Sequence, residues 1–322
     1  MKIVGILLAR MGSSRRPGKS LADVSGAPLI TRILQRMLAF DRFDEVVLAS
    51  PDTEQDQPLL AAGKAAGAIP FAGSEEDVLD RLYQAAKARG ADIIVHIGGD
   101  CPFCDHELMG RALDMLLEGE AEFVSNLNPM TYPAGLDVDA MTIGALERCW
   151  ERATLKTTRI HCLSYIHQNP EQFRTLNFEH TENIGHLRWT LDYPEDLELV
   201  RRVFEALGPQ GQYFGMQQIL DFLAANPEIA ALNAHLSDFV PDQPAYWDSE
   251  GYLSDLRDDI ANLISEAGLL DGDRNYGAAA ATYAQARDMI GELFTRADTF
   301  ARRHGGADTT TEGIQCMSAT NV

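Results

Sequence analysis

The chain has 322 residues, of which 45% are hydrophobic, so it is long and apolar enough for one large domain with an addition. Its 48 Asp and Glu residues outnumber its 27 Lys and Arg residues, which gives a formal net charge of −21. Because such a surface repels polyanions at long range, we expect no nucleic acid and no membrane as a partner, and any polyanionic ligand must bind at a local basic cluster.

Five cysteines, odd in number and scattered along the chain, favour a reducing compartment over a disulfide framework. Cys101 and Cys104 have the spacing of a zinc or redox pair, but no second pair completes a zinc pattern, so ordinary packing is the favoured interpretation. The apolar run 3–9 is too short for a secretory signal, and the sequence has no other long apolar stretch. We therefore expect a cytoplasmic protein.

Predicted strands and helices alternate through the first hundred residues. The strands are expected at 3–9, 45–50, 69–71 and 92–97, and the helices at 29–38, 56–66 and 77–89. This alternation predicts an open, mostly parallel α/β sheet, a fold that binds ligands at the carboxyl ends of its strands. The loop 10–19 and Asp100 both fall at such ends.

The second half of the chain is less regular. We expect a helix to about 118, a strand at 122–125, helices at 143–153 and 159–168, a strand at 187–192, and a helix that starts within 192–196 and ends near 207. From residue 241 two helical stripes follow, Tyr252, Leu256, Ile260, Leu263, Ala267 and Leu270, then Tyr276, Ala280, Tyr283, Ile290, Leu293, Phe294, Ala297 and Phe300. The sequence therefore predicts a first domain over 1–240, an α-helical hairpin over 241–304 and a disordered tail over 305–322.

The loop after the first predicted strand is the basic cluster that the overall charge requires. Residues 1–22 include Lys2, Arg10, Arg15, Arg16 and Lys19 and no acidic residue. Gly18-Lys19-Ser20 has the ending of a P-loop, but five residues instead of four separate Gly12 from Gly18, and the helical pattern starts well after Lys19. The loop is therefore not a P-loop. We expect instead that Arg10, Arg15 and Lys19 surround a triphosphate, the alternative being a solvated basic turn.

The same loop, read as "ARMGSSRRPGKSL", resembles the signature of the sugar-activating nucleotidyltransferases, in particular the CMP-sugar-acid synthetases and the spore-coat polysaccharide cytidylyltransferases. Five further blocks resemble that subgroup in the same order: "AGSEEDVLDRLYQAA", "IGGDCPFCD", "TYPAGLDVD", "RWTLDYPEDLELV" and "NPEIAALN". The likeness covers about residues 1–235. It implies a Rossmann-like nucleotidyltransferase fold over the first domain, CTP as the nucleotide donor and Mg²⁺ as the cofactor.

The resemblance also implies which residues form the site. Arg10, Arg15 and Lys19 are the expected catalytic cations, which hold the triphosphate and stabilise the leaving pyrophosphate. The expected nucleotide-binding residues are Leu8, Ala9, Arg10, Gly12, Ser13, Lys19, Arg81 and Gly99. Asp100, at a strand end after two glycines, and Asp192 are the expected metal ligands, and Asp137, Asp139, Arg188 and His161 are the expected acceptor-binding residues.

Several of these residues have a simpler structural interpretation. Asp100 suits a turn or a helix cap, and Asp192 suits the N-cap of the following helix. Arg81 is placed to form an ion pair with Asp77, four residues earlier on a helix. A turn with an edge strand accounts for Asp137 and Asp139, Arg188 suits a structural role, and His161 suits ordinary helix packing.

Three positions depart from the subgroup's pattern on the acceptor side. Ile160 replaces an acid, Asp139 replaces a glutamate, and His96 stands where a basic residue is common. The expected function is that of a Mg²⁺-dependent cytidylyltransferase that makes a CMP-linked sugar acid and forms a homodimer through the hairpin. The alternatives are a CTP-dependent enzyme for a sugar phosphate or phosphonate, and a non-catalytic scaffold subunit.

Overall fold

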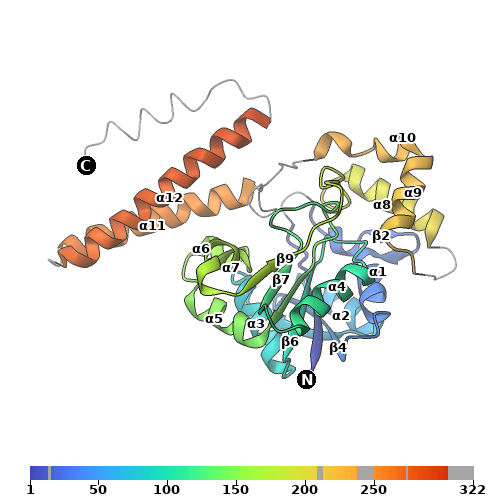
Figure 1. Ribbon diagram of the computed structural model, residues 1–322, viewed down its shortest axis with the longest axis horizontal. Helices are drawn as coiled ribbons and strands as arrows, with labels where there is room; N and C mark the ends of the chain where they lie inside the picture. The colour runs from blue at the N-terminus through green and yellow to red at the C-terminus, as the bar shows by residue number, and fades with distance from the viewer. Residues whose placement is uncertain (14–15, 209–212, 238–249, 273–274, 304–322) are drawn as a thin grey trace. The chain divides into compact units, whose positions relative to one another are not determined.

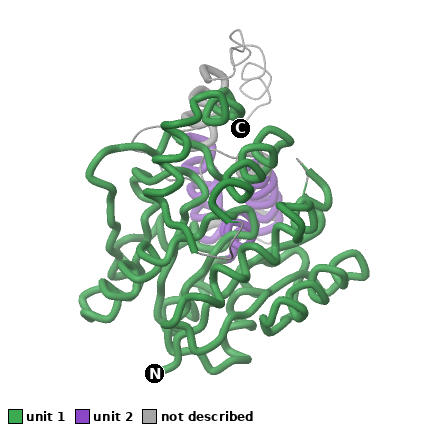
Figure 2. Tube along the Cα trace, turned by 90° about the vertical axis from the view of Figure 1, so that its right-hand side faces the viewer, with its two compact units in different colours: residues 1–153, 162–245 green, residues 154–161, 246–322 purple. Residues whose placement is uncertain are grey.

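The computed structural model describes residues 1–13, 16–208, 213–237, 250–272 and 275–303. The chain divides into two compact units, one of residues 1–153 and 162–245 and one of residues 154–161 and 246–322 (Figure 2). The short segment 154–161 thus belongs with the C-terminal helices, although the sequence pattern places it inside the first domain. The predicted tail 305–322 lies outside the described residues.

The first unit is built on a mixed sheet whose strands follow the order β5-β4-β1-β6-β8-β7-β9. The strands are β1 (Ile3–Leu8), β4 (Glu45–Pro51), β5 (Ile69–Gly73), β6 (Ile93–Gly98), β7 (Phe123–Ser125), β8 (Asp139–Thr142) and β9 (Thr175–Asn177). The first four of this order are parallel, whereas β8 runs antiparallel to both β6 and β7. The predicted mixed, mostly parallel α/β fold is confirmed (Figure 1).

Helices cover both faces of this sheet (Figure 1). One core contains residues of α1 (Leu29–Leu38), α4 (His106–Leu117), α8 (Pro194–Leu207) and α9 (Met216–Ala225), and the other contains residues of α3 (Val78–Ala88), α5 (Ile143–Arg152) and α7 (Ser164–Gln168). Successive residues of β1 enter opposite cores, Ile6 one and Leu7 the other, because strand side chains alternate in direction. This double burial explains why β1 is a continuous apolar run.

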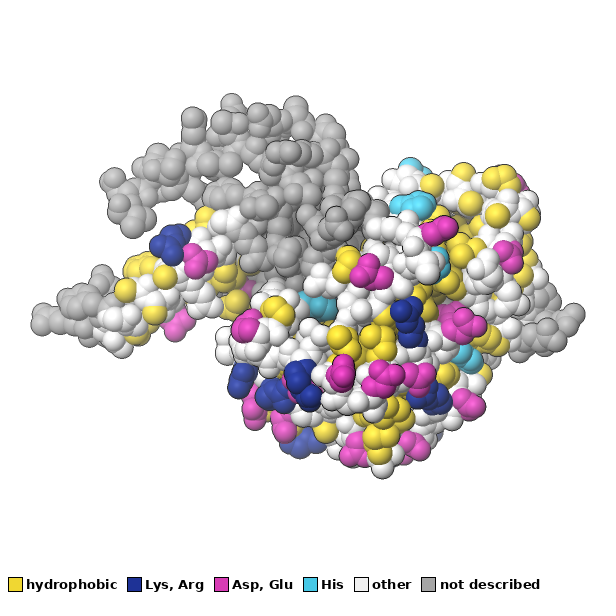
Figure 3. Space-filling model, viewed as in Figure 1, with side chains coloured by type: hydrophobic (Ala, Val, Ile, Leu, Met, Phe, Trp, Pro, Cys, Tyr) yellow, Lys and Arg dark blue, Asp and Glu magenta, His cyan; other side chains and the backbone are white. Residues whose placement is uncertain are grey.

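Seven further elements, all within the described residues, complete the first unit. They are η1 (Lys19–Leu21), β2 (Asp23–Val24), β3 (Ala27–Pro28), α2 (Gln57–Ala66), η2 (Pro170–Gln172), α10 (Pro227–Ala230) and η3 (Ala234–Leu236). On the face drawn in Figure 3, basic side chains lie interspersed with acidic ones.

Two predicted elements are wrong. The single helix expected at 159–168 is two short helices, α6 (Lys156–Ile160) and α7, because α6 packs with the second unit while Ile166 of α7 is buried in the first. The strand expected at 187–192 is absent from the described sheet. Its backbone bonds instead to loops: Trp189 N donates to the carbonyl of Ala134, and Leu191 N to that of Asp100.

The second unit contains α6, α11 (Glu250–Gly272) and α12 (Tyr276–Arg303). The hairpin prediction therefore holds for α11 and α12, and Leu256, Ile260 and Leu263 of the first stripe are buried. In the second stripe Ile290 packs against the hairpin core as expected, but Ala280 and Tyr283 are exposed, and Ala279 and Ala286 are buried instead. The other side chains of this stripe lie outside the described residues, namely those of Tyr276, Leu293, Phe294, Ala297 and Phe300. Small alanines allow close contact between the two helices. Within the described residues, no helix is both long and apolar enough to cross a membrane.

Candidate active site

The loop after β1 is folded around a backbone carbonyl. The amides of Ser13 and Gly18 both donate to the carbonyl oxygen of Met11, each at 3.0 Å, and Gly18 has a positive φ of 74° that suits glycine. Lys19 then starts a short 3₁₀ turn, and α1 begins only at Leu29. This geometry differs from a P-loop, in which a helix begins at the lysine.

Lys19 joins the two carboxylates that the sequence singles out as metal ligands. Its Nζ lies 2.8 Å from Oδ1 of Asp192 and 3.2 Å from Oδ2 of Asp100, and it also donates to the carbonyl of Leu191 at 3.0 Å. The two carboxylate oxygens are therefore less than about 6 Å apart. Burial alone lowers the pKa of the Lys19 ammonium, but the two facing carboxylates raise it above its usual value, so this group is a cation at neutral pH.

This pair of carboxylates fits a hard divalent cation. Both are oxygen ligands, they converge on one point, and that point already holds a positive charge in the Lys19 ammonium. Among the described residues, no group of three or more His, Cys, Asp and Glu side chains forms a ready-made metal site. A cation held by two carboxylates keeps coordination positions for other oxygens, which is how Mg²⁺ is usually bound beside phosphates.

A buried ionic network positions Asp192. Arg188 Nη2 lies 3.2 Å from Asp192 Oδ2, and Arg188 Nε lies 2.9 Å from Oδ1 of the fully buried Asp196. Asp196 Oδ2 accepts the amides of Asp192 and Tyr193, so Asp196, not Asp192, satisfies the amides that precede α8. Arg188 therefore has the structural contacts that were the alternative to a role in acceptor binding. Asp192 has its other carboxylate oxygen turned toward Lys19.

Asp100 is positioned through its backbone. Its carbonyl accepts hydrogen bonds from Leu191 N at 2.9 Å and from Thr190 Oγ1 at 3.2 Å. The segment that was expected to be a strand therefore links both candidate metal ligands. Neither contact is visible in the spacing of the sequence.

The expected nucleotide-binding backbone is brought together at the ends of β1 and β6. Leu8 pairs with Gly98 across these parallel strands. A Cβ at Gly99 would lie 2.7 Å from both the Ala9 Cβ and the Leu8 carbonyl oxygen, so only glycine fits there. Arg10 is exposed beside this contact. Gly12 is also exposed. Arg15 lies outside the described residues.

Arg81 is a buried cation near the basic loop. It is 2% exposed and donates to the Ser74 carbonyl, while its Nε has no hydrogen-bond partner among the described residues. Burial lowers the pKa of Arg81, and the nearby charge of Arg10 adds to that effect. The Asp77 carboxylate accepts the amide of Asp80 as the N-cap of α3. Buried donors left unpaired are costly, so Arg81 suits a ligand oxygen.

The acceptor candidates divide between two places. Asp137 is half-buried and accepts the Gly135 amide at 3.2 Å, and burial raises the pKa of Asp137 to about 7. Asp139 is buried and faces His96 across β8 and β6, with 3.3 Å between Asp139 Oδ2 and His96 Nδ1. His161, in contrast, belongs to the second unit, where its Nε2 lies 3.4 Å from Asp255 Oδ2.

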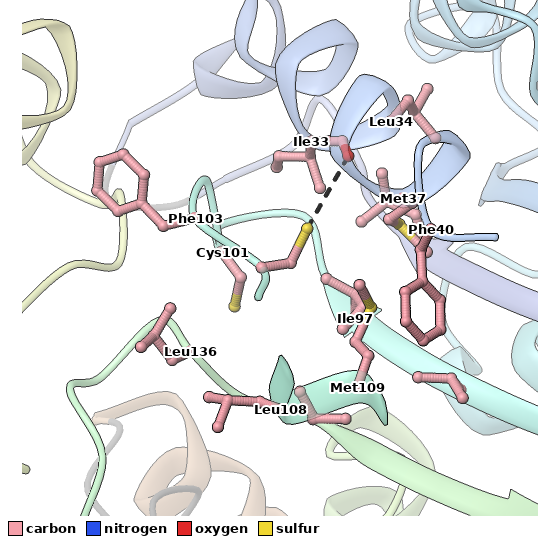
Figure 4. Packing of buried hydrophobic residues seen from close by; sticks show 14 of the residues in the cluster. Ile33, Leu34, Met37, Phe40, Ile97, Cys101, Phe103, Leu108, Met109 and Leu136 are labelled. Carbon is pink, nitrogen blue, oxygen red and sulfur yellow. Dashed lines mark hydrogen bonds between the residues drawn. The ribbon is translucent and has the colours of Figure 1, made fainter. Parts of the chain in front are cut away.

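The Cys101 and Cys104 pair is part of the core, as Figure 4 shows for Cys101, Phe103 and Leu136. The thiol of Cys104 lies 4.0 Å from the Ile33 carbonyl, marked by the dashed line. Burial raises the pKa of the Cys104 thiol to about 11, and it also raises the pKa of Cys101. Neither thiol is therefore ionised at neutral pH, in keeping with packing rather than redox chemistry.

Sequence reasoning missed three polar residues that support this site. Asp56 accepts the amide of Met11 at 2.7 Å and so fixes the start of the basic loop. Asn126 and Asp196 are almost fully buried and bond to backbone groups beside Asp137 and Asp192. A polar residue in an otherwise apolar segment, such as Asn126 after β7, is the signal that could have identified it.

Comparison with known proteins agrees with this geometry. The sequence model of the cytidylyltransferase family matches residues 4–218. The spore coat polysaccharide biosynthesis protein SpsF of Bacillus subtilis is 30% identical over 241 residues, which are 71% of this chain and 96% of that protein. The 3-deoxy-manno-octulosonate cytidylyltransferase of Trichlorobacter lovleyi is 33% identical over 117 residues, 36% of this chain and 46% of that protein.

A solved cytidylyltransferase from Leptospira borgpetersenii superposes with a TM-score of 0.68 at 29% identity, covering 71% of this chain and 97% of that one. The family match includes the loop after β1 with Lys19, the end of β6 with Asp100, and Asp192. The chain belongs to the cytidylyltransferase family and is a CTP-dependent nucleotidyltransferase.

Proposed function

We propose that this enzyme transfers CMP from CTP to a hydroxyl group of a sugar acid, of the nonulosonic or 3-deoxy-octulosonic type, and releases pyrophosphate. The observation that carries the proposal is the contact of Lys19, at the end of the basic loop 10–19, with both Asp100 and Asp192. The relatives named above, one in spore-coat polysaccharide synthesis and one acting on 3-deoxy-manno-octulosonate, support a sugar acid for a surface glycan.

The chain's cations provide the charge that this reaction needs. The acceptor oxygen forms a bond to the α-phosphorus while the bond from that phosphorus to the β-phosphate oxygen breaks, so negative charge develops on pyrophosphate. Lys19, Arg10 and Arg15 neutralise this charge, and the Gly12 amide binds a phosphate oxygen. Most of the rate enhancement then comes from alignment and electrostatics.

Asp100 and Asp192 are the residues that would hold Mg²⁺. The ion, when bound, supplies positive charge to the phosphates and orients them. When CTP binds, the Lys19 ammonium would exchange its contacts with these two carboxylates for contacts with the triphosphate, which is also an anion. Arg188 and Asp196 keep Asp192 in place throughout.

Asp137 and Asp139 are the groups best suited to acceptor hydroxyls. Both lie at the carboxyl end of β6, where β8 begins beside His96. A carboxylate accepts hydrogen bonds from hydroxyls, which suits an acceptor with several hydroxyls, such as a sugar acid. The Arg188 guanidinium is already hydrogen-bonded to Asp196.

We further propose that the enzyme is cytoplasmic and homodimeric.

The experiment is an assay of pyrophosphate release with Mg²⁺ and CTP over a set of acceptors. N-acetylneuraminic, legionaminic and 3-deoxy-octulosonic acids are compared with sugar phosphates and phosphonates. We expect release with one sugar acid and none without Mg²⁺. Release only with a phosphorylated acceptor would replace the proposed substrate class.

Asp100→Asn tests the metal ligand in the same assay. The substitution removes one of two carboxylates, so we expect turnover to fall by about 100-fold or more while the melting temperature changes little, since Asp100 is 40% exposed. Turnover equal to that of the unchanged enzyme would remove Asp100 from the metal site. Complete silence of both proteins, without thermal stabilisation by CTP, would favour the scaffold interpretation.

A further inference from the structure

Asn126 is a buried amide that bonds twice to one short loop. It follows β7 and is 1% exposed. Its Nδ2 donates to the carbonyl of Leu136 at 2.9 Å, and its Oδ1 accepts the amide of Val138 at 2.9 Å. A carbonyl only accepts and an amide N–H only donates, so both bonds can form in one orientation of the side chain only.

These two bonds bracket Asp137, the residue between Leu136 and Val138. The Leu136 and Val138 side chains are 1% and 0% exposed, whereas that of Asp137 is only half-buried. Side chains alternate in direction along extended backbone, so fixing the backbone on either side of Asp137 fixes the direction of its carboxyl group. The Gly135 amide also donates a hydrogen bond to Asp137 Oδ1, which further restrains the carboxyl group.

The opposite side of the loop is held by a different segment. Ala134 N donates to the Leu187 carbonyl at 2.9 Å, and Trp189 N donates to the Ala134 carbonyl at 2.7 Å. Those bonds fix the loop before Gly135, but not the residues beside Asp137. Asn126 is therefore the side chain that restrains the second half of the loop.

An apolar side chain at this position would leave the Leu136 carbonyl and the Val138 amide without these partners. Burying a primary amide loses its bonds to water, and the two bonds that Asn126 forms mainly recover that loss. The paired amide also has a single defined orientation, which fixes the two backbone groups relative to β7. We infer that Asn126 is a positioning residue, which aims the Asp137 carboxyl group at the hydroxyl groups of the acceptor; this inference rests on the proposed function.

Asn233 provides a matched control. It is 2% exposed, and its Nδ2 donates to the Arg188 carbonyl at 2.9 Å and to Asp196 Oδ1 at 2.8 Å. It is thus a second buried amide with two bonds, but it serves the network behind Asp192. Asn126→Ala and Asn233→Ala remove the same atoms and have comparable costs in stability.

The two variants are expected to differ in kinetics. Asn126→Ala should raise KM for the acceptor about tenfold or more and leave KM for CTP within about twofold, because only the aim of Asp137 changes. Asn233→Ala should instead raise the Mg²⁺ concentration needed for half-maximal turnover. A purely structural Asn126 would change both KM values alike or neither, and that result would overturn the inference.

A second measurement needs no acceptor. The Cys101 thiol lies under the loop, 4.0 Å from Asp137 Oδ2, and is 2% exposed. Asn126→Ala should increase alkylation of Cys101 by iodoacetamide about tenfold, measured by peptide mass spectrometry, whereas Asn233→Ala should not, and Cys104 is the internal reference. Unchanged labelling of Cys101 would show that Asn126 does not hold the loop.

These readouts separate the inference from the proposed function. If no sugar acid is turned over but Asn126→Ala exposes Cys101, the proposed substrate class is wrong. Asn126 would then still restrain the loop of Asp137, but this restraint would not serve the binding of sugar-acid hydroxyls. If Asn126→Ala does not fold, Asn126→Ser replaces it. That variant is neutral and keeps one hydrogen-bonding group at this position, so a smaller effect of the same kind is expected.

Discussion

Asp137 combines partial burial with the absence of an ion pair to any described basic residue. Burial raises the pKa of its carboxyl group to about 7 from an ordinary 3.8, although the hydrogen bond from the Gly135 amide opposes the shift. An acid whose pKa is raised in the folded state destabilises the fold when it is charged. The destabilisation is absent below about pH 4 and grows as the pH rises to about 7, where it is largely present.

Asp137→Asn should therefore change stability in a pH-dependent way. An amide of the same shape has no charge to bury, so we expect the variant to be more stable than the unchanged protein at pH 8 by at least about 1 kcal/mol, and equally stable near pH 4. Urea unfolding at both pH values measures this difference. A gain in stability of the same size at both pH values would mean that the charge of Asp137 is not its cause.

The site residues illustrate how far single residues could be predicted. The basic loop and Asp100 follow from composition and from their place at strand ends. That Asp192 meets Asp100 at Lys19 does not follow from spacing, because a loop contact between Leu191 and Asp100 brings them together. The ion pair of Arg188 with Asp196 was equally hidden, since an arginine before several acids has many potential partners.

At the scale of elements, Gly135 joins the loop that carries Asp137 to the segment before Asp192. Its φ is +100°, and a Cβ there would lie 2.6 Å from Thr190 N and 2.7 Å from the Trp189 carbonyl carbon. Both the backbone conformation and the space require glycine. The close approach allows the hydrogen bonds between Ala134 and the residues on either side of Arg188.

Gly135→Ala should separate these two segments. Gly119 is the control, because its φ is +84° but a Cβ there would meet nothing within 4 Å. Gly119→Ala adds backbone strain alone, about 1 kcal/mol, and Gly135→Ala should cost about 2–4 kcal/mol in urea unfolding because the clash is added to the strain. Equal costs for the two variants would show that the loop yields without loss of packing.

Strands that are buried on both faces were predicted well. Segments whose structure depends on which distant part of the chain their backbone bonds to were not. The run of β1 reads as a strand because each of its side chains, apart from Gly5, enters one core or the other. The segment 187–192 alternates apolar and polar residues as a half-buried strand does, with Trp189 and Leu191 buried, but its backbone bonds to loops instead of to a strand. β9 has three residues, too few for a periodic signal.

At the scale of the whole molecule, a contact distant in sequence defines the second unit. Asp259 of α11 is 4% exposed, and its Oδ1 accepts the Lys156 amide at 2.7 Å. Its Oδ2 accepts the Thr157 amide at 2.9 Å and the Thr157 hydroxyl at 2.7 Å. Asp259 thus satisfies the first amides of α6 and fastens the segment 154–161 to the hairpin. No local pattern in either segment predicts this pairing.

Asp259→Ala should loosen the second unit, and Asp258→Ala is its neighbouring control. Asp258 is 55% exposed, and its partner among the described residues is Lys156, whose exposed ammonium is 2.7 Å away. Such a pair contributes less than about 1 kcal/mol. Loss of the Asp259 carboxylate leaves the buried Thr157 amide and hydroxyl and the partly buried Lys156 amide without acceptors, which costs about 2–4 kcal/mol.

Limited trypsin digestion followed by mass spectrometry measures this difference directly, because cleavage after Arg257 and Arg287 requires the hairpin to open. We expect Asp259→Ala to speed cleavage at both sites by about tenfold or more and Asp258→Ala to leave it nearly unchanged. Equally slow cleavage of both variants would mean that the apolar contacts of Leu256, Ile260 and Met289 suffice to hold the hairpin. The segment 154–161 would then depend on the hairpin without stabilising it in return.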